Sequence, residues 1–175
     1  MLHRQVTRLC GDPAARGRIV VDVPKKKLRA INVLGLQQYL YGVVPAEMPS
    51  AWLPAALQAQ AVAARSFALA SRKVGASFDV YAGGVSQAYL GVSAETSAGK
   101  RAVNESAGEV LLYNGEVADT LFSSSTGGRT ESAADAFGTS GKPYLVSVPD
   151  PYDTISPYHD WGPVPVTGKT LGSAV

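Results

Sequence analysis

The sequence predicts an α+β fold in a single domain, with a mixed or antiparallel sheet, a hairpin and two main helices. Three observations support this prediction. An alanine-rich stretch over 54–72 has the spacing of an amphipathic helix. Two alternating segments, 18–23 and 28–34, flank a short lysine-rich turn. Asn114-Gly115 joins two further alternating segments and strongly favours a tight hairpin. Strands paired in hairpins indicate α+β rather than a doubly wound parallel sheet.

Length and composition fit one globular domain. The chain has 175 residues, 46% of them hydrophobic, which is enough for one sizeable core. Its formal net charge of +2 is too small to indicate nucleic-acid binding. No apolar run reaches the length of a transmembrane helix, and the first residues lack a signal-peptide core. We expect an N-terminal extension over 1–17, a folded domain over 18–161 and a loosely ordered tail over 162–175.

The turn between the first two strands carries Lys25, Lys26 and Lys27. Lysines beside an edge strand commonly prevent pairing with other chains, and this is the simpler interpretation. A weak attraction to anionic polymers is the other interpretation.

A carboxylate stands between two prolines before the main helix. Pro45 and Pro49 flank Glu47, and each proline disfavours helix at the residue before it. We therefore expect Glu47 on a stiff, non-helical segment that leads into the helix. A side chain held in this way is suited to a catalytic acid. The alternative is that Glu47 only complements the positive end of the following helix.

One face of the main helix consists mostly of small side chains, so another element can pack very close to it. Its members are Leu53, Leu57, Ala61, Ala64 and Ala68. The other expected elements are a helical turn at 37–41, strands at 80–81 and 88–90, a helix over 94–107, a hairpin of 109–113 with 117–122, a polar loop over 123–132 and a strand at 144–148.

Few residues could support metal, thiol or histidine chemistry. The chain has one cysteine, Cys10, and two histidines, His3 and His159. Zinc sites normally combine three or four such ligands, and no acidic cluster offers an alternative, so we expect no metal and no cofactor. A serine triad needs a central histidine, and His159 is the only internal candidate, which makes that mechanism a poor fit.

Five motifs occur in one order from about residue 28 to residue 161. The first spans 39–69 and reads YLYGVVPAEMPSAWLPAALQAQAVAARSFAL. The others are Asp79 with SQAYLG at 86–91, AVNESAG at 102–108, SSSTGGRT at 123–130, and PYL at 143–145 with PDPYD at 149–153 and Trp161. Together these motifs resemble the SpoIID/LytB family, the stage II sporulation protein D domain.

The resemblance implies a peptidoglycan lytic transglycosylase, which cleaves the bond between N-acetylmuramic acid (MurNAc) and N-acetylglucosamine (GlcNAc). Ordinary glycosidases use two carboxylates. A lytic transglycosylase needs one, because the 6-hydroxyl of MurNAc attacks C1 and closes a 1,6-anhydro ring. By position in the motif, Glu47 is the catalytic acid/base. The implied substrate-binding residues are Gln87, Ser124, Ser125, Thr126, Gly127 and Gly128.

Each of these assignments has a structural alternative. Gln87 could be an interior amide, and the serine loop could be a plain mobile turn. Trp52 and Tyr89 could stack on sugar rings, although we expect Trp52 in the core. Gln60 and Arg65 could hold the Glu47 segment by hydrogen bonds, or Arg65 could lie on a solvated helix face.

A second role is also compatible with the resemblance: a non-catalytic cell-wall-binding module that localises or enhances an amidase. The expected partners are peptidoglycan glycan strands, with a cell-wall amidase or the sporulation machinery as further candidates, and no nucleic acid. The family implies an extracytoplasmic location in the cell wall or envelope.

Overall fold

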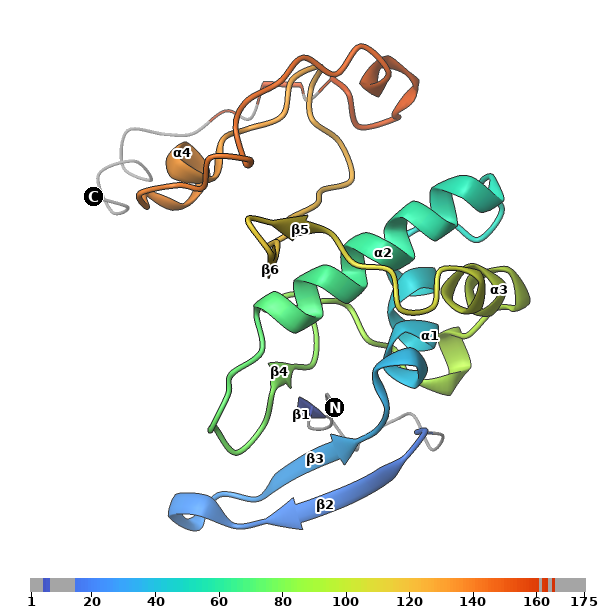
Figure 1. Cartoon of the computed structure of the whole chain (residues 1–175), viewed down its shortest axis with the longest axis vertical. Coiled ribbons are helices and arrows are strands. Elements are labelled where there is room, and N and C mark those ends of the chain that lie inside the picture. The colour runs from blue at the N-terminus through green and yellow to red at the C-terminus, as the bar shows by residue number, and fades with distance from the viewer. Residues whose placement is uncertain (1–4, 7–14, 161, 164, 166–175) are drawn as a thin grey trace. The chain divides into compact units, whose positions relative to one another are not determined.

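A computed structural model describes residues 5–6, 15–160, 162–163 and 165 (Figure 1). His3, Cys10, Trp161 and most of the predicted tail lie outside the described residues. The chain divides into two compact units, Met1–Leu121 and Phe122–Val175, and each is described by itself. No helix of the described residues is long and apolar enough to cross a membrane. Both helices and strands are present, which confirms the α+β class.

A four-stranded mixed sheet lies in the first unit. It contains β1 (Gln5–Val6), β2 (Arg18–Asp22), β3 (Arg29–Val33) and β4 (Val80–Tyr81), in the order β2-β3-β1-β4. The β2–β3 and β1–β3 pairs are antiparallel, and the β1–β4 pair is parallel. The predicted hairpin of the first two strands is therefore confirmed. Strand β1 falls inside the segment that the sequence assigns to an extension.

Helix α1 (Leu36–Glu47) corrects the prediction around Glu47. The sequence predicts a helical turn at 37–41 and a non-helical Glu47, yet the helix continues through Pro45 and ends at Glu47. Pro45 has no N–H for the usual helical bond to the residue four positions earlier, but Leu40, Val43 and Val44 of the same helix are fully buried, and this packing stabilises the helix against that loss. Pro49 acts as predicted, because the residue before it, Met48, is extended (φ −141°, ψ 136°) and stops the helix.

The core of the first unit forms where α1 meets α2 (Pro54–Ala70) and α3 (Ser97–Glu105). Helix α2 matches the predicted helix, and Ala61, Ala64 and Ala68 of the predicted face are fully buried. Leu53, assigned to the same face, is instead exposed because it precedes the first turn. Helix α3 is shorter than predicted and follows the 3₁₀ turn η2 (Val92–Ala94).

Arg65 is buried and holds the helices together. Its guanidinium donates to the side chain of Gln37 and to the carbonyl groups of Val103 and Glu109. Burial lowers the pKa of Arg65, and the charge of Glu109 partly offsets that shift. Arg65 therefore acts on the packing of α1, α2 and α3, so the alternative that it lies on a solvated helix face is wrong.

The second predicted hairpin is also confirmed, with shorter strands: β5 (Leu112–Tyr113) and β6 (Glu116–Val117). Asn114 and Gly115 have φ values of 50° and 84°, as a tight hairpin turn requires.

The second unit contains α4 (Ala133–Phe137) and the 3₁₀ turn η3 (Asp153–Ile155). The strands predicted at 88–90 and 144–148 do not form among the described residues. Around the latter, isolated backbone bonds such as Thr130 N–H to the Val148 carbonyl replace a continuous ladder.

Candidate active site

Glu47 is a partly buried carboxylate at the end of α1. Its Oε1 accepts a short hydrogen bond of 2.6 Å from the backbone N–H of Ala88. This is its one hydrogen bond with the described residues. Its partner, Ala88, is not in the first turn of the following helix α2, so the carboxylate forms no hydrogen bond with that turn. The carboxylate therefore keeps acceptor capacity for a ligand.

The backbone that binds Glu47 is itself fixed by Gln87. The Gln87 side chain is 1% exposed, and both its polar atoms are used. Its Oε1 accepts from the Tyr39 hydroxyl at 3.0 Å, and its Nε2 donates to the Ala64 carbonyl of α2 at 3.2 Å. Gln87 thus joins α1 to α2 directly beside the N–H that Glu47 accepts.

Two stacked tyrosines support this arrangement. The rings of Tyr39 and Tyr89 lie 5.5 Å apart at an interplanar angle of 20°, and the Tyr89 hydroxyl accepts from Asn32 of β3 at 3.3 Å. Burial raises the pKa of Tyr39 well above its usual range, and the nearby charge of Glu47 adds to the shift. Tyr39 therefore stays a neutral donor to Gln87.

A glycine permits the close approach of α1 to Tyr89. A Cβ atom at Gly42 would lie 2.8 Å from Cε2 of Tyr89, which is too close for any side chain. The YGVV segment of the first motif thus serves packing, and it brings the end of α1 against residues 87–89.

Trp52 differs from its prediction. It is 53% exposed in the turn between α1 and α2, so the expectation that it packs in the core is wrong. Tyr89, the other proposed stacking residue, is buried against Tyr39. An exposed indole is suited to stacking on a sugar ring.

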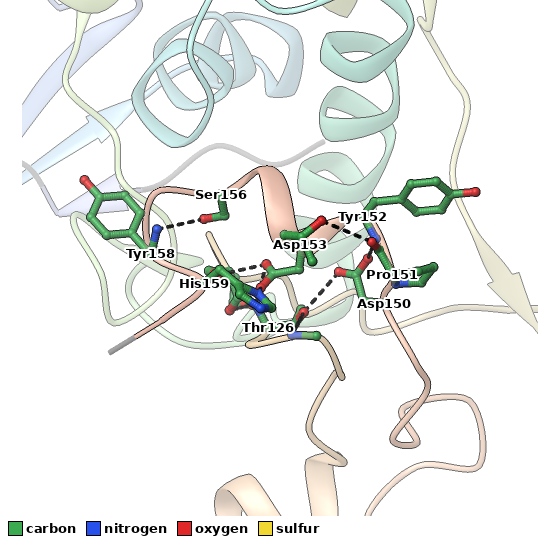
Figure 2. A network of polar contacts seen from close by, with 12 residues as sticks. Thr126, Asp150, Pro151, Tyr152, Asp153, Ser156, Tyr158 and His159 are labelled. Atoms are coloured by element: carbon green, nitrogen blue, oxygen red, sulfur yellow. Dashed lines mark hydrogen bonds and ion pairs between the residues drawn. The ribbon is translucent and has the colours of Figure 1, made fainter. Parts of the chain in front are cut away.

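The predicted serine loop lies in the second unit, where Asp153 organises it (Figure 2). Asp153 is 7% exposed. Its Oδ1 accepts from the Ser125 hydroxyl at 2.8 Å and from the Thr126 N–H at 2.9 Å, and its Oδ2 lies 2.8 Å from Nδ1 of His159. One carboxylate thus anchors both the loop and the segment that follows it.

Further bonds close the same network. The Thr126 hydroxyl donates to Asp150 at 3.1 Å and accepts from the N–H of Gly128 at 3.2 Å. Gly127 and Gly128 have φ values of 65° and 94°, which L side chains rarely adopt. The hydroxyls of Ser125 and Thr126 both form hydrogen bonds within the second unit, whereas Ser124 is exposed.

The charges in this network stabilise each other. The hydrogen bond from His159 holds the pKa of Asp153 well below its usual range, and the Thr126 N–H contributes further. The same contact raises the pKa of His159, against a smaller opposing effect of desolvation. Asp153 stands between Ser125 and His159, so the order differs from a nucleophilic triad, where histidine contacts serine.

The sequence reasoning missed Asp153 and His159 as partners of the serine loop. A signal was present in the PDPYD motif, which ends at Asp153, but 28 positions separate Asp153 from Ser125. Gln60 was assigned to support of the Glu47 segment. Its Nε2 is buried and has no hydrogen-bond partner among the described residues. Within the same residues, no group of three or more His, Cys, Asp or Glu side chains could hold a metal ion.

Comparison with known proteins identifies similar sequences. The sequence profile of SpoIID, described as stage II sporulation protein, matches residues 24–113. The chain is 32% identical over 180 residues to stage II sporulation protein D of Bacillus subtilis (strain 168), covering 89% of this chain and 52% of that protein.

Two other relatives extend the comparison. The chain is 33% identical over 156 residues to stage II sporulation protein D of Bacillus amyloliquefaciens, covering 79% of this chain and 45% of that protein. It is 40% identical over 115 residues to an amidase enhancer of Bacillus subtilis (strain 168), covering 65% of this chain and 15% of that protein. The chain thus spans about half the length of the two sporulation proteins.

Proposed function

Because the chain belongs to the stage II sporulation protein D (SpoIID) family, we propose that it is a peptidoglycan lytic transglycosylase. It cleaves the MurNAc–GlcNAc bond of glycan strands and leaves 1,6-anhydro-MurNAc ends. The observation that carries the proposal is the state of Glu47. Its carboxylate is held by one short bond at Oε1, while Oε2 has no hydrogen-bond partner among the described residues.

Glu47 performs both proton transfers of the reaction. In its protonated form it gives the proton to the glycosidic oxygen as the bond to C1 of MurNAc breaks with its electron pair on that oxygen. The carboxylate then takes the proton of the MurNAc 6-hydroxyl as that oxygen bonds to C1. Glu47 ends protonated again, so the cycle needs no second carboxylate. Attack within the same sugar supplies the high effective concentration that a water molecule lacks.

Gln87 acts as a positioning residue in this proposal. Its two buried hydrogen bonds fix residues 87–89, and the Ala88 N–H fixes Oε1 of Glu47. These contacts support an indirect role more than direct sugar binding. Ser124, Ser125, Thr126, Gly127 and Gly128 remain the proposed sugar-contacting loop, and the exposed Trp52 is a further candidate for stacking on a sugar ring.

The products test this proposal. The chain is incubated in ¹⁸O-labelled water with purified glycan strands, either stripped of stem peptides or intact, and the fragments are analysed by mass spectrometry. We expect 1,6-anhydro ends without ¹⁸O, because the nucleophile belongs to the sugar. Reducing ends that contain ¹⁸O would indicate hydrolysis and contradict the proposal. The strand type that is cleaved identifies the substrate.

A non-catalytic role is the second candidate, and the similarity to an amidase enhancer favours it. In that role the chain binds cell-wall glycan outside the cytoplasm and localises or stimulates an amidase. It then yields no anhydro ends with either strand type, but it increases the release of stem peptides when a cell-wall amidase is added.

A further inference from the structure

The two strands β2 and β3 are joined by a turn whose backbone is unusual for its residues. Lys25 and Lys26 occupy the two central positions, with φ values of 50° and 63°. The N–H of Lys27 donates to the carbonyl of Pro24 at 3.0 Å. Positive φ at both central residues defines a type I′ turn. The turn lies at the end of the hairpin away from α1 (Figure 1).

Lysine is a poor residue for these positions. Left-handed backbone is sterically unfavourable for side chains other than glycine, asparagine and aspartate, and type I′ turns therefore prefer Asn-Gly. The hairpin of β5 and β6 has the same turn and uses the preferred pair, Asn114 and Gly115. The backbone conformation thus does not explain why lysine occupies positions 25 and 26, so the reason must lie in the lysine side chains.

The three lysine charges have no acidic partner within the part of the chain that the structure describes. Lys25, Lys26 and Lys27 are exposed, and none of their side-chain ammonium groups forms a hydrogen bond or ion pair with another residue that the structure describes. The nearest acidic residue along the strand, Asp22, is paired with Arg29 through two bonds of 2.8 and 2.5 Å. Protection of a sheet edge does not account for the lysines either, because they lie beyond the last paired residues of the ladder, Asp22 and Arg29.

Exposed apolar side chains flank the lysines. Val23 is 63% exposed and Leu28 is 73% exposed. These residues follow the Asp22–Arg29 pair on either side of the turn, and Val21 of β2 is also exposed. Binding of a soluble polyanion would require only the charged lysine side chains. Cations beside exposed apolar side chains fit a surface that is anionic outside and apolar beneath.

We propose that residues 23–28, the hairpin tip, dock on an anionic phospholipid surface. The lysines contact the lipid phosphates, and Val23 and Leu28 enter the boundary between headgroups and acyl chains. The proposal is independent of glycan cleavage, so substitution of Glu47 leaves it unaffected.

Vesicle co-sedimentation tests the proposal with the whole chain. Phosphatidylcholine vesicles with about 30% phosphatidylglycerol are compared with pure phosphatidylcholine vesicles at about 0.1 M salt. We expect binding to the anionic vesicles only. Lys25→Asn with Lys26→Gly copies the other hairpin and removes two charges. This variant should bind about 25-fold more weakly, about fivefold for each lysine. Its melting temperature should equal or exceed that of the parent.

Two further variants separate charge from apolar contact. Val23→Ser with Leu28→Ser keeps the lysines and should weaken binding by about 10²-fold, since both apolar side chains lose their burial. Arg72→Gln with Arg101→Gln removes the same charge from elsewhere on the chain and should bind like the parent.

Several results would overturn the proposal. The parent could bind neutral and anionic vesicles equally, or the double lysine variant could bind as tightly as the parent. The double arginine variant could also lose as much binding as the double lysine variant. If the serine variant bound like the parent and soluble polyphosphate displaced it from the vesicles, the ligand would be a soluble polyanion and not a lipid surface. A lower melting temperature of the lysine variant would show that the lysines stabilise the turn.

Discussion

Glu47 and Asp153 are carboxylates in opposite environments, one in each unit of the chain. Asp153 is almost fully buried and uses both oxygens for hydrogen bonds to Ser125, Thr126 and His159. Glu47 is partly exposed and accepts one bond from the described residues, from the N–H of Ala88. Both oxygens of Asp153 are therefore engaged within its own unit, whereas Oε2 of Glu47 has no hydrogen-bond partner among the described residues.

Two carboxylates of this chain can thus have different roles, one structural and one chemical. A carboxylate surrounded by donors is held ionised and acts as an anchor. A carboxylate with one fixed oxygen and one available oxygen has the geometry of a general acid. Our proposal for the enzyme depends on this difference, and the following substitutions test it.

Gln87→Leu should have the largest effect of the supporting substitutions. It removes both bonds that fix residues 87–89, so Glu47 loses its defined position. We expect kcat to fall about 10²-fold with little change in KM, because displacement by about 1 Å has this cost. Tyr39→Phe removes only one of the two bonds and keeps the ring, so its effect on kcat should be smaller. If Gln87→Leu had the same kcat as the parent, Gln87 would not be needed to position Glu47.

Ala64→Leu should destabilise the first unit. Ala64 is fully buried on α2 and belongs to the core cluster of the first unit, so extra side-chain volume has no free space. Overpacking of this kind costs roughly 1–3 kcal/mol in the free energy of unfolding. Chemical denaturation measures this change, with the exposed Ala55→Leu on the same helix as the control. Equal stability of Ala64→Leu and the parent would contradict the packing described here.

The Asp153 network should depend on pH in a defined direction. The pKa of Asp153 is lowered from 3.8, so its stabilising contribution is present above that pH and is lost as pH falls through its folded pKa. The pKa of His159 is raised from 6.5, so its contribution is present below that pH and is lost as pH rises through its folded pKa. The network is therefore strongest between about pH 3.8 and pH 6.5.

Hydrogen exchange at the Thr126 amide measures this dependence, after correction for the intrinsic effect of pH on exchange. We expect protection to decrease above pH 6.5 in the parent. His159→Gln should remove that decrease because the titrating group is absent. A decrease that persists in the variant would assign the effect to another group.

Ser125→Ala should have the smallest effect. The Ser125 hydroxyl is one of several donors to Asp153, and the Thr126 N–H continues to hold the loop. We expect turnover to fall by less than about tenfold, the equivalent of one hydrogen bond, with glycan affinity nearly intact. If Ser125→Ala bound glycan more weakly and the parent itself showed no turnover, the wall-binding module would be favoured.

Local sequence patterns predicted much of the fold. The alanine-rich helix, the Asn114-Gly115 turn and the first hairpin depend on neighbouring residues, and all three are confirmed. The prediction failed at Pro45, because the effect of a proline on its neighbours is a local tendency, which the packing of α1 in the core overrides. It also failed at Trp52, where periodicity does not determine burial.

Long-range partners in the candidate site could not be predicted in this way. The assignment of Glu47 came from its motif, but its contact with Ala88 joins residues 41 positions apart. The same applies to Gln87, whose bonds to Tyr39 and Ala64 depend on how two helices pack. Residue type indicates what a side chain can do, and only the packed structure indicates which partners it has.

The rate of glycan cleavage by Glu47→Gln tests the central claim most directly. Glutamine keeps the shape and can still accept the Ala88 N–H, but it cannot transfer a proton. We predict that release of anhydro ends falls by about 10²–10⁴-fold, with an unchanged melting temperature. Glu116→Gln, an exposed position in the hairpin of β5 and β6, should keep parental activity. Release of anhydro ends by folded Glu47→Gln at near the parental rate would contradict the account.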